Sequence, residues 1–306
     1  MTALAESPHT GADVICAGLV HIYPGEDGPI VALRNLDLEV RAGEMLALLG
    51  PSGSGKSTLL AVLSGMLRPT AGKVLVAGHD MARLDEGGIS RLRATDLALL
   101  LQDPLENLIP YATAVENLAF VQRGARRRRW SLRWTPDELI DTFGLAPLAA
   151  RPVYQLSGGE QQKVAMASAV ATSPRVLVAD EPTTNLDAAS RSAVIDGLRR
   201  AREISGATVI VATHDATTAA AFPRTMTIAH GAIGEEGRGG RRFAVVGRGG
   251  TVQLPSEVAA LYPAGSLFRV VVTDSVVELR PETPSGGEGA PDAGDASDAE
   301  MPWEEQ

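Results

Sequence analysis

One short segment constrains this chain more than any other feature: Gly50-Pro51-Ser52-Gly53-Ser54-Gly55-Lys56-Ser57-Thr58, which fits the pattern GxxxxGK[ST]. The apolar run Met45–Leu49 precedes it and predicts a strand, and a helical pattern over residues 56–66 begins inside it. A strand, a glycine-rich loop and a helix in this order form the context in which such a loop binds phosphate. We therefore expect an α/β fold with a phosphate-binding loop at residues 50–58.

The residue types of this loop suit phosphate chemistry. Glycines let the backbone curl so that successive N–H groups point at phosphate oxygens, and the helix N-terminus adds partial positive charge. Lys56 can reach the β- and γ-phosphates, and the Ser57 hydroxyl can ligate Mg²⁺. Because the chain has only three lysines, Lys56, Lys73 and Lys163, the alternative of a Gly/Ser loop that contains lysine by chance is the weaker one. We expect a bound nucleotide with Mg²⁺.

An apolar run over residues 176–179 ends in two carboxylates, Asp180 and Glu181. In open α/β sheets, ligands lie at the carboxyl ends of the strands. Asp180 is placed to hold Mg²⁺, directly or through water, and Glu181 is placed to polarise the attacking water as general base. A strand that simply reaches solvent would also end in acids, but the phosphate loop upstream favours the catalytic interpretation.

A second candidate anion site lies in Leu156-Ser157-Gly158-Gly159-Glu160-Gln161-Gln162. Ser157 would cap a helix that begins with Gly158 and Gly159, which makes another helix terminus able to bind an anion. The alternative is a plain capped helix. Two such helix starts in one chain suggest two surfaces that meet across one nucleotide.

These segments resemble the motifs of the ATP-binding-cassette (ABC) ATPases in order and rough spacing, over about residues 13–235. LSGGEQQ is similar to the family signature, and VLVADEP to its acidic strand end. Further positions fit the family: Gln102 resembles the Q-loop glutamine, Asn185-Leu186-Asp187 the D-loop, His214 the switch histidine, and Tyr23 the A-loop aromatic that stacks on adenine.

The resemblance implies a fold and a mechanism. The fold would be that of a P-loop NTPase of the ABC type, with a mostly parallel central sheet, an antiparallel β subdomain and a helical subdomain at about residues 103–170. Two copies would dock head to tail, and each ATP would lie between the Lys56 loop of one copy and the Ser157–Gly158–Gly159 helix start of the other, near Asp187. The implied catalytic residues are Glu181, His214, Gln102 and Lys56, and the implied Mg²⁺ ligands are Ser57, Gln102 and Asp180. Asp187 has a structural alternative, as the N-cap of a helix at 187–204.

Within the family, LSGGEQQ, VENL and EPTTNLD look most like the ATPase subunits of MacB, lipoprotein-release and FtsE-type systems. Three positions depart from those relatives: Lys163 and Ser168 stand where an arginine is usual, and Thr184 replaces a usual glycine. The segment DPLENLIPYAT, which would face the membrane partner, is only loosely similar.

The resemblance implies that MgATP hydrolysis powers transmembrane permease subunits, and the alternative is an FtsE-like ATPase that drives transmembrane signalling. No apolar run reaches the roughly 18 residues that a membrane span needs, so the permease would be a separate polypeptide. The single cysteine, Cys16, and the lack of a signal-peptide pattern fit a reducing compartment. We expect a peripheral location at the cytoplasmic face of the cell membrane.

The basic run at residues 126–129 is followed by Trp130 and Trp134. One hypothesis is contact with anionic lipid headgroups, through arginine charge and interfacial tryptophan. The alternative is a solvated insertion between helices. Because the run is isolated, we expect no nucleic-acid binding.

We expect four parts along the chain: a flexible N-terminus at 1–12, the ABC ATP-binding domain at 13–235, a small β-rich accessory unit at 236–281 and a disordered tail at 282–306. The accessory unit weakly resembles the swapped-hairpin β units of AbrB and MazE type, with a glycine turn, VQLP, a short helix and two closing strands. The tail holds eight acids and no Lys or Arg, and the rest of the chain carries −1 of the net charge of −9. Such a composition favours disorder.

Overall fold

The computed structural model describes residues 11–26, 28–128, 130–184, 186–246, 250–252, 254, 258, 261–262, 266–273 and 276–281. The chain divides into two units, Met1–Pro255 and Ser256–Gln306, and each is described by itself. The expected tail at 282–306 lies outside the described residues, as does the N-terminus except for residues 11 and 12.

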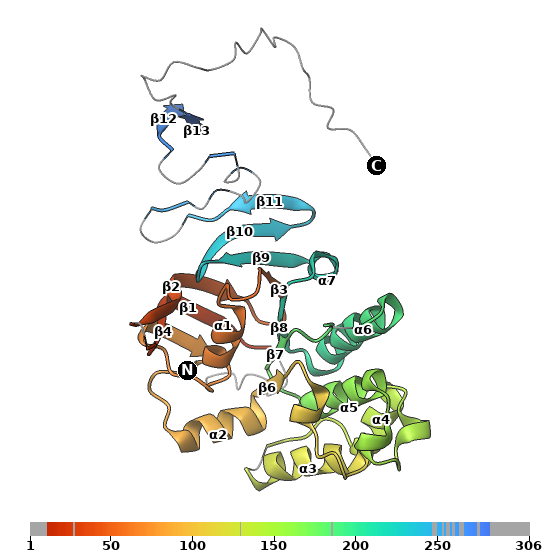
Figure 1. The fold of residues 1–306 in the computed structure, drawn as a ribbon. Helices are drawn as coiled ribbons and strands as arrows, with labels where there is room; N and C mark the ends of the chain where they lie inside the picture. Colours follow the sequence, from red (N-terminus) through yellow and green to blue (C-terminus); the bar gives the residue numbers. More distant parts are fainter. Residues whose placement is uncertain are drawn as a thin grey trace, which may run out of the picture. The chain divides into compact units, whose positions relative to one another are not determined.

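A seven-stranded sheet forms the centre of the first unit (Figure 1). Its strand order is β11-β10-β9-β3-β8-β7-β6. The five strands from β9 to β6 run parallel, and β10 and β11 extend the sheet antiparallel. The strands are β3 (Met45–Leu49), β6 (Leu97–Leu100), β7 (Val176–Asp180), β8 (Thr208–Thr213), β9 (Arg224–Ala229), β10 (Ala232–Arg238) and β11 (Arg241–Ala244).

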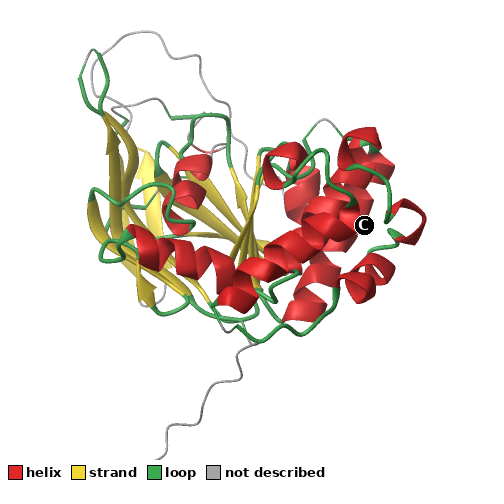
Figure 2. Cartoon of the chain, turned by 90° about the horizontal axis from the view of Figure 1, so that it is seen from below, coloured by secondary structure: helices red, strands yellow, loops and turns green. Residues whose placement is uncertain are grey.

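Strands β3, β7 and β8 are apolar at most positions because both faces of the sheet are covered there. In β3, Met45 and Ala47 belong to one buried cluster, and Leu46 and Leu48 belong to the other. Helices lie on either side of these strands (Figure 2). Parallel strands therefore end together at one edge of the sheet, where the phosphate loop and the acidic strand end follow β3 and β7.

A second, antiparallel sheet has the order β2-β1-β4-β5. Helix α1 (Lys56–Leu63) packs between the two sheets, with Leu59 and Leu63 fully buried. The second sheet is made of β1 (Val14–Tyr23), β2 (Ile30–Val40), β4 (Ala71–Val76) and β5 (His79–Asp80). The next strand along the chain after β2, β3, belongs to the central sheet and not to this second sheet.

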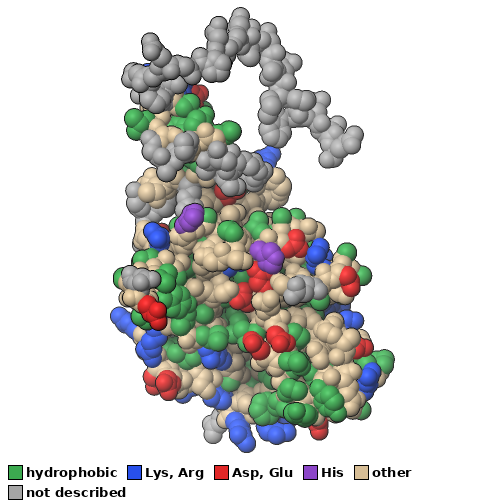
Figure 3. Space-filling view, in the orientation of Figure 1, with side chains coloured by type: hydrophobic (Ala, Val, Ile, Leu, Met, Phe, Trp, Pro, Cys, Tyr) green, Lys and Arg blue, Asp and Glu red, His purple; other side chains and the backbone are tan. Residues whose placement is uncertain are grey.

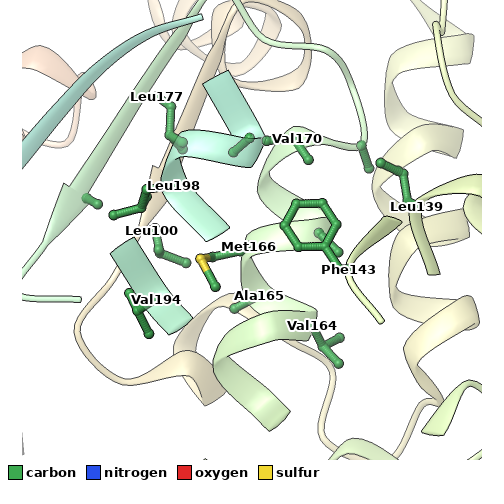
Figure 4. Packing of buried hydrophobic residues seen from close by; sticks show 14 of the residues in the cluster. Leu100, Leu139, Phe143, Val164, Ala165, Met166, Val170, Leu177, Val194 and Leu198 are labelled. Atoms are coloured by element: carbon green, nitrogen blue, oxygen red, sulfur yellow. The ribbon is translucent and has the colours of Figure 1, made fainter. Parts of the chain in front are cut away.

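The helical layer packs on the opposite face of the central sheet. Met166 lies among Leu100, Val194 and Leu198 in the shared core (Figure 4). The helices of the first unit are α2 (Glu86–Thr95), α3 (Ala114–Arg127), α4 (Pro136–Thr142), α5 (Gly158–Val170), α6 (Ala188–Ser205) and α7 (Ala216–Ala220), with short 3-10 turns η1 (Pro104–Asn107), η2 (Ala146–Leu148) and η3 (Val153–Gln155). The expected helical subdomain at 103–170 is thus η1 to α5. No helix in the described part of the chain is long and apolar enough to cross a membrane.

Both tryptophans after the basic run are structural. The Trp130 indole N–H donates to the carbonyl oxygen of Thr172 at 2.7 Å, and that of Trp134 donates to Ile204 at 3.3 Å. Both side chains are half-buried, and their indole N–H groups are bonded inside the domain rather than free for lipid headgroups. Arg128 bonds Ser90, and Arg129 lies outside the described residues.

The central sheet extends beyond the expected boundary at residue 235. Strand β11, which we expected in the accessory unit, pairs with β10 through a tight turn at Gly239 and Gly240, both at positive φ. An isolated bridge joins Val246 and Val252. The second unit contains a hairpin of β12 (Phe268–Thr273) and β13 (Val276–Pro281).

Candidate functional site

The phosphate loop requires its glycines for reasons within this chain. A Cβ on Gly50 would lie 2.3 Å from the carbonyl oxygen of Ile228. Gly55 has φ +105°, and a Cβ there would lie 2.7 Å from the carbonyl oxygen of Ala32. The loop is therefore pressed against neighbouring backbone, in a conformation that only glycine adopts without strain.

Lys56 is buried (5% exposed), and its Nζ donates to the carbonyl oxygens of Gly50 at 2.7 Å and Pro51 at 3.0 Å. Its ammonium group thus folds back over its own loop. Helix α1 has no side-chain cap at its N-terminus, and the Ser54 hydroxyl is buried without a partner. Unpaired donors, a helix start and a buried ammonium fit the triphosphate of a nucleotide.

Ser57 and Asp180 meet beside this loop, where Ser57 Oγ donates to Asp180 Oδ1 at 3.3 Å. Burial raises the pKa of the Asp180 carboxyl, and the hydrogen bond from Ser57 partly opposes that rise. Among the described residues, no cluster of three or more His, Cys, Asp and Glu could hold a metal alone. A hydroxyl and one carboxylate fit Mg²⁺, which takes few protein oxygens when phosphates supply others.

Glu181 occupies the point where the candidate catalytic groups converge. Its Oε1 lies 3.8 Å from Nζ of Lys56, and its Oε2 lies 2.8 Å from Nδ1 of His214. The Thr184 hydroxyl donates to the same Oε2 at 3.1 Å. The Glu181 backbone has φ +46°, an uncommon conformation for a residue with a side chain, and such conformations cluster at functional sites.

A cleft of about 480 Å³ runs along these groups. The Tyr23 hydroxyl, at its edge, lies 3.3 Å from Thr58 Oγ1. A histidine and acidic side chains lie near the middle of the face in Figure 3. The cleft is lined by Tyr23, Ile30, Val31, Ala32, Ser52, Gly53, Gly55, Lys56, Ser57, Thr58, Gln102, Glu181, Thr184 and His214.

The expected site residues on α5 and α6 are not among those that line this cleft. Ser157 caps α5 through a capping box with Glu160, whose Oε2 accepts from the Ser157 backbone N–H at 2.8 Å. Asp187 caps α6 by accepting from the Ser190 N–H at 2.8 Å, and Asn185 lies outside the described residues. Within one chain, both helix starts are ordinary caps.

Gly158 and Gly159 differ from the loop glycines. A Cβ on either would have no atom within 4 Å, and neither has a positive φ. In a helix, glycine is about 1 kcal/mol less favourable than alanine. This chain by itself therefore gives no reason for the two glycines, and that points to a close approach by something outside it.

Four cleft residues were not among the predicted site residues: Ile30, Val31, Ala32 and Thr184. The first three follow the turn after Tyr23 and become part of the wall only because β2 pairs with β1. Thr184 carried a signal, because it departs from the glycine usual at that position.

A family model described as ABC transporter matches residues 33–184. The lipoprotein-releasing system ATP-binding protein LolD of Anaeromyxobacter dehalogenans is 40% identical over 213 residues, which are 69% of this chain and 88% of that protein. The methionine import ATP-binding protein MetN of Cupriavidus pinatubonensis is 35% identical over 222 residues, 72% of this chain and 64% of that protein.

A similar solved structure is the dimeric post-hydrolysis state of the ATP-binding cassette MJ0796 bound to ADP and Pi. The two structures have a TM-score of 0.64 and 33% sequence identity, and their alignment covers 75% of this chain and 100% of the MJ0796 chain. The expected fold is confirmed by this similarity.

Proposed function

This chain belongs to the ABC transporter family and is an ATP-hydrolysing subunit of a transporter, and from that premise we propose which residues perform the reaction. Lys56 and His214 both lie against the carboxylate of Glu181, and this arrangement supports the assignment of these three residues to catalysis. Lys56 and the loop N–H groups hold the β- and γ-phosphates. Glu181 accepts a proton from the attacking water, and His214 contacts the γ-phosphate.

The chemical step is an in-line displacement. The water oxygen forms a bond to the γ-phosphorus while the bond to the bridging oxygen breaks and its electron pair leaves with ADP. The water proton passes to Glu181. Mg²⁺, held by Ser57 and Asp180 with Gln102 nearby, would supply neutralisation of the phosphate charge. Tyr23 stacks against the adenine from the edge of the cleft.

A second copy completes the site. Within one chain, a side chain at Gly158 or Gly159 would meet no other atom. A nucleotide bound to another copy and lying close to these residues would explain why they are glycines. The start of α5 in one copy then faces the Lys56 loop of the other, with Asp187 at the same junction, in a head-to-tail dimer. Catalysis depends on closure, because the phosphate charge is surrounded only when both helix starts are present.

We place the permease contact in a cleft of about 790 Å³ between α2 and α3. It is lined by the exposed Met66 and Phe120 and by three arginines of α3 and its C-cap, Arg123, Arg127 and Arg128. Hydrophobic side chains also gather over the helical layer in Figure 3. This surface suits a short amphipathic permease segment with acidic residues, at the cytoplasmic face of the membrane.

The test is Glu181→Gln in the full chain. We expect ATP binding to persist, an ATP-dependent dimer to accumulate, and hydrolysis to fall by about 10²-fold or more, the scale of losing a positioned base. Turnover and dimer content are measured by phosphate release and by size-exclusion chromatography with ATP. Turnover within a few-fold of the unmodified protein would remove Glu181 from the role of base.

A further inference from the structure

Thr184 is the one cleft residue whose side chain contacts the carboxylate of Glu181 from the same loop. Its Oγ1 donates to Glu181 Oε2 at 3.1 Å, and its backbone N–H donates to the Glu181 carbonyl oxygen at 3.2 Å. Residues 181–184 thus form a tight turn closed by two bonds. The hydroxyl reaches the oxygen atom rather than solvent because this turn brings it back over the glutamate.

The two oxygens of the carboxylate have different surroundings. Oε2 is held by Thr184 Oγ1, by His214 Nδ1 at 2.8 Å and by the His214 backbone N–H at 3.4 Å. An ionised carboxylate only accepts, so Nδ1 is the donor in this bond. Oε1 is turned toward the phosphate loop, 3.8 Å from Nζ of Lys56.

The turn that carries Thr184 is itself fixed. Thr183 is buried, and its hydroxyl lies 3.0 Å from that of Thr218, which donates to Asp215 at 2.8 Å. The Glu181 N–H donates to the Ala212 carbonyl oxygen of β8 at 2.9 Å. The Thr184 hydroxyl therefore has little freedom, and its bond to Oε2 costs little ordering entropy.

We infer that Thr184 is a positioning residue for hydrolysis: its hydroxyl holds Oε2 of Glu181 so that Oε1 faces the attacking water. This inference rests on the proposed role of Glu181 as base. His214 also holds Oε2, but its side chain is 52% exposed and it is assigned to the γ-phosphate. When His214 turns to the phosphate, Thr184 keeps the carboxylate oriented.

A merely structural role predicts different behaviour. A hydroxyl that only closes the turn would change the stability of the loop, and its loss would alter ATP binding and turnover together. A positioning hydroxyl acts in the transition state, so its loss lowers kcat while the KM for ATP stays the same.

The test compares Thr184→Val, which keeps the shape and removes the donor, with Thr184→Ser, which keeps the donor. In the full chain with MgATP, we expect Thr184→Val to lower kcat by about five- to tenfold, the scale of one net intramolecular hydrogen bond, with KM within twofold. Thr184→Ser should stay within twofold of the unmodified kcat. Thermal melting checks folding, and Thr184→Ala replaces the valine variant where that variant melts early.

A background of Glu181→Gln separates this inference from the proposed function. There, Thr184→Val should change the residual rate by less than twofold, because the base it positions is gone. Unmodified kcat in Thr184→Val, equal losses in the serine and valine variants, or a change in KM alone would each overturn the inference. Near-normal turnover in Glu181→Gln would instead overturn the role of Glu181.

Discussion

Helix α1 begins at Lys56 behind a glycine with no side-chain cap, whereas helix α5 begins behind a capping box made by Ser157 and Glu160. Helices α3 and α4 begin with boxes of the same kind, made by Thr and Glu. The first helix start thus leaves its N–H groups open to a phosphate. The second has the Ser157 and Glu160 N–H groups bonded within the single chain, as in the two ordinary helices.

The glycines at the two helix starts also differ, in whether this chain leaves room for a side chain. Gly50 and Gly55 are required by backbone of this chain that a Cβ would strike at 2.3 and 2.7 Å. Gly158 and Gly159 face open space. A glycine with an internal reason marks a site that one chain builds alone. Gly158 and Gly159 have no such reason, and we assign them to the contact with a second copy.

Gly55→Ala should give the largest effect, because it breaks the start that is complete within the chain. The side chain meets both a left-handed backbone and the Ala32 carbonyl oxygen, so we expect destabilisation of about 2–3 kcal/mol and loss of ATP binding. Denaturant unfolding measures the loss of stability, and an equilibrium nucleotide-binding assay measures the loss of ATP affinity. Gly53→Ala is the matched control for stability, since Gly53 has φ +76° but open space around an added Cβ. It should be destabilised less than Gly55→Ala.

Gly159→Ala should leave the single chain intact and damage only the assembly. We expect the folding stability to rise by up to about 1 kcal/mol through helix propensity, and ATP binding to stay within twofold. Hydrolysis should fall tenfold or more, because the added methyl group lies where the second copy's nucleotide approaches.

Gly87→Ala is the control for that variant. Gly87 lies in the first turn of α2, and the nearest atom to an added Cβ is a side-chain oxygen of Asp85 at 3.7 Å. It should give a similar stability gain with unchanged hydrolysis. If Gly159→Ala hydrolyses ATP at the unmodified rate, the glycines of α5 do not mark an interface.

The predictability of the fold follows from how local each signal is. The run at 176–179 predicted β7 because buried parallel strands are continuously apolar. Helix α2 escaped prediction because its sequence, EGGISRLRAT, has two glycines and little apolar periodicity. That β3 joins a different sheet from β1 and β2 depends on contacts with β8 and β9, far along the chain.

The same difference between local and long-range signals decides which parts of the candidate site could be predicted. The sequence predicted the phosphate loop and Glu181 because their chemistry lies in contiguous residues. It missed Ile30 as a wall of the cleft because that position depends on strand pairing. The hydrogen bonds of the two tryptophans were not predictable because the carbonyl groups that the indoles bond lie 42 and 70 residues away.

The smallest effect concerns the cap that closes α5. Hydrogen bonds from the Ser157 backbone and hydroxyl hold the pKa of Glu160 below its ordinary value. Because the folded-state pKa is depressed, the stabilisation is full above the ordinary value of 4.5 and is lost as the pH falls through the folded-state pKa. Glu160→Gln should therefore lower Tm most above pH 5, and its Tm should approach that of the unmodified protein as the pH falls below the ordinary value of 4.5.

Glu138→Gln provides the comparison, since Glu138 caps α4 in the same way and its pKa is lowered by the same kind of bonds to Thr135. Both variants should show the same pH dependence of Tm. Only Glu160→Gln should tighten the ATP-dependent dimer formed in a Glu181→Gln background, by about two- to fivefold, because it removes a negative charge from a helix start that meets a phosphate. Equal dimer affinity in the two variants would mean that α5, like α4, is capped for folding alone.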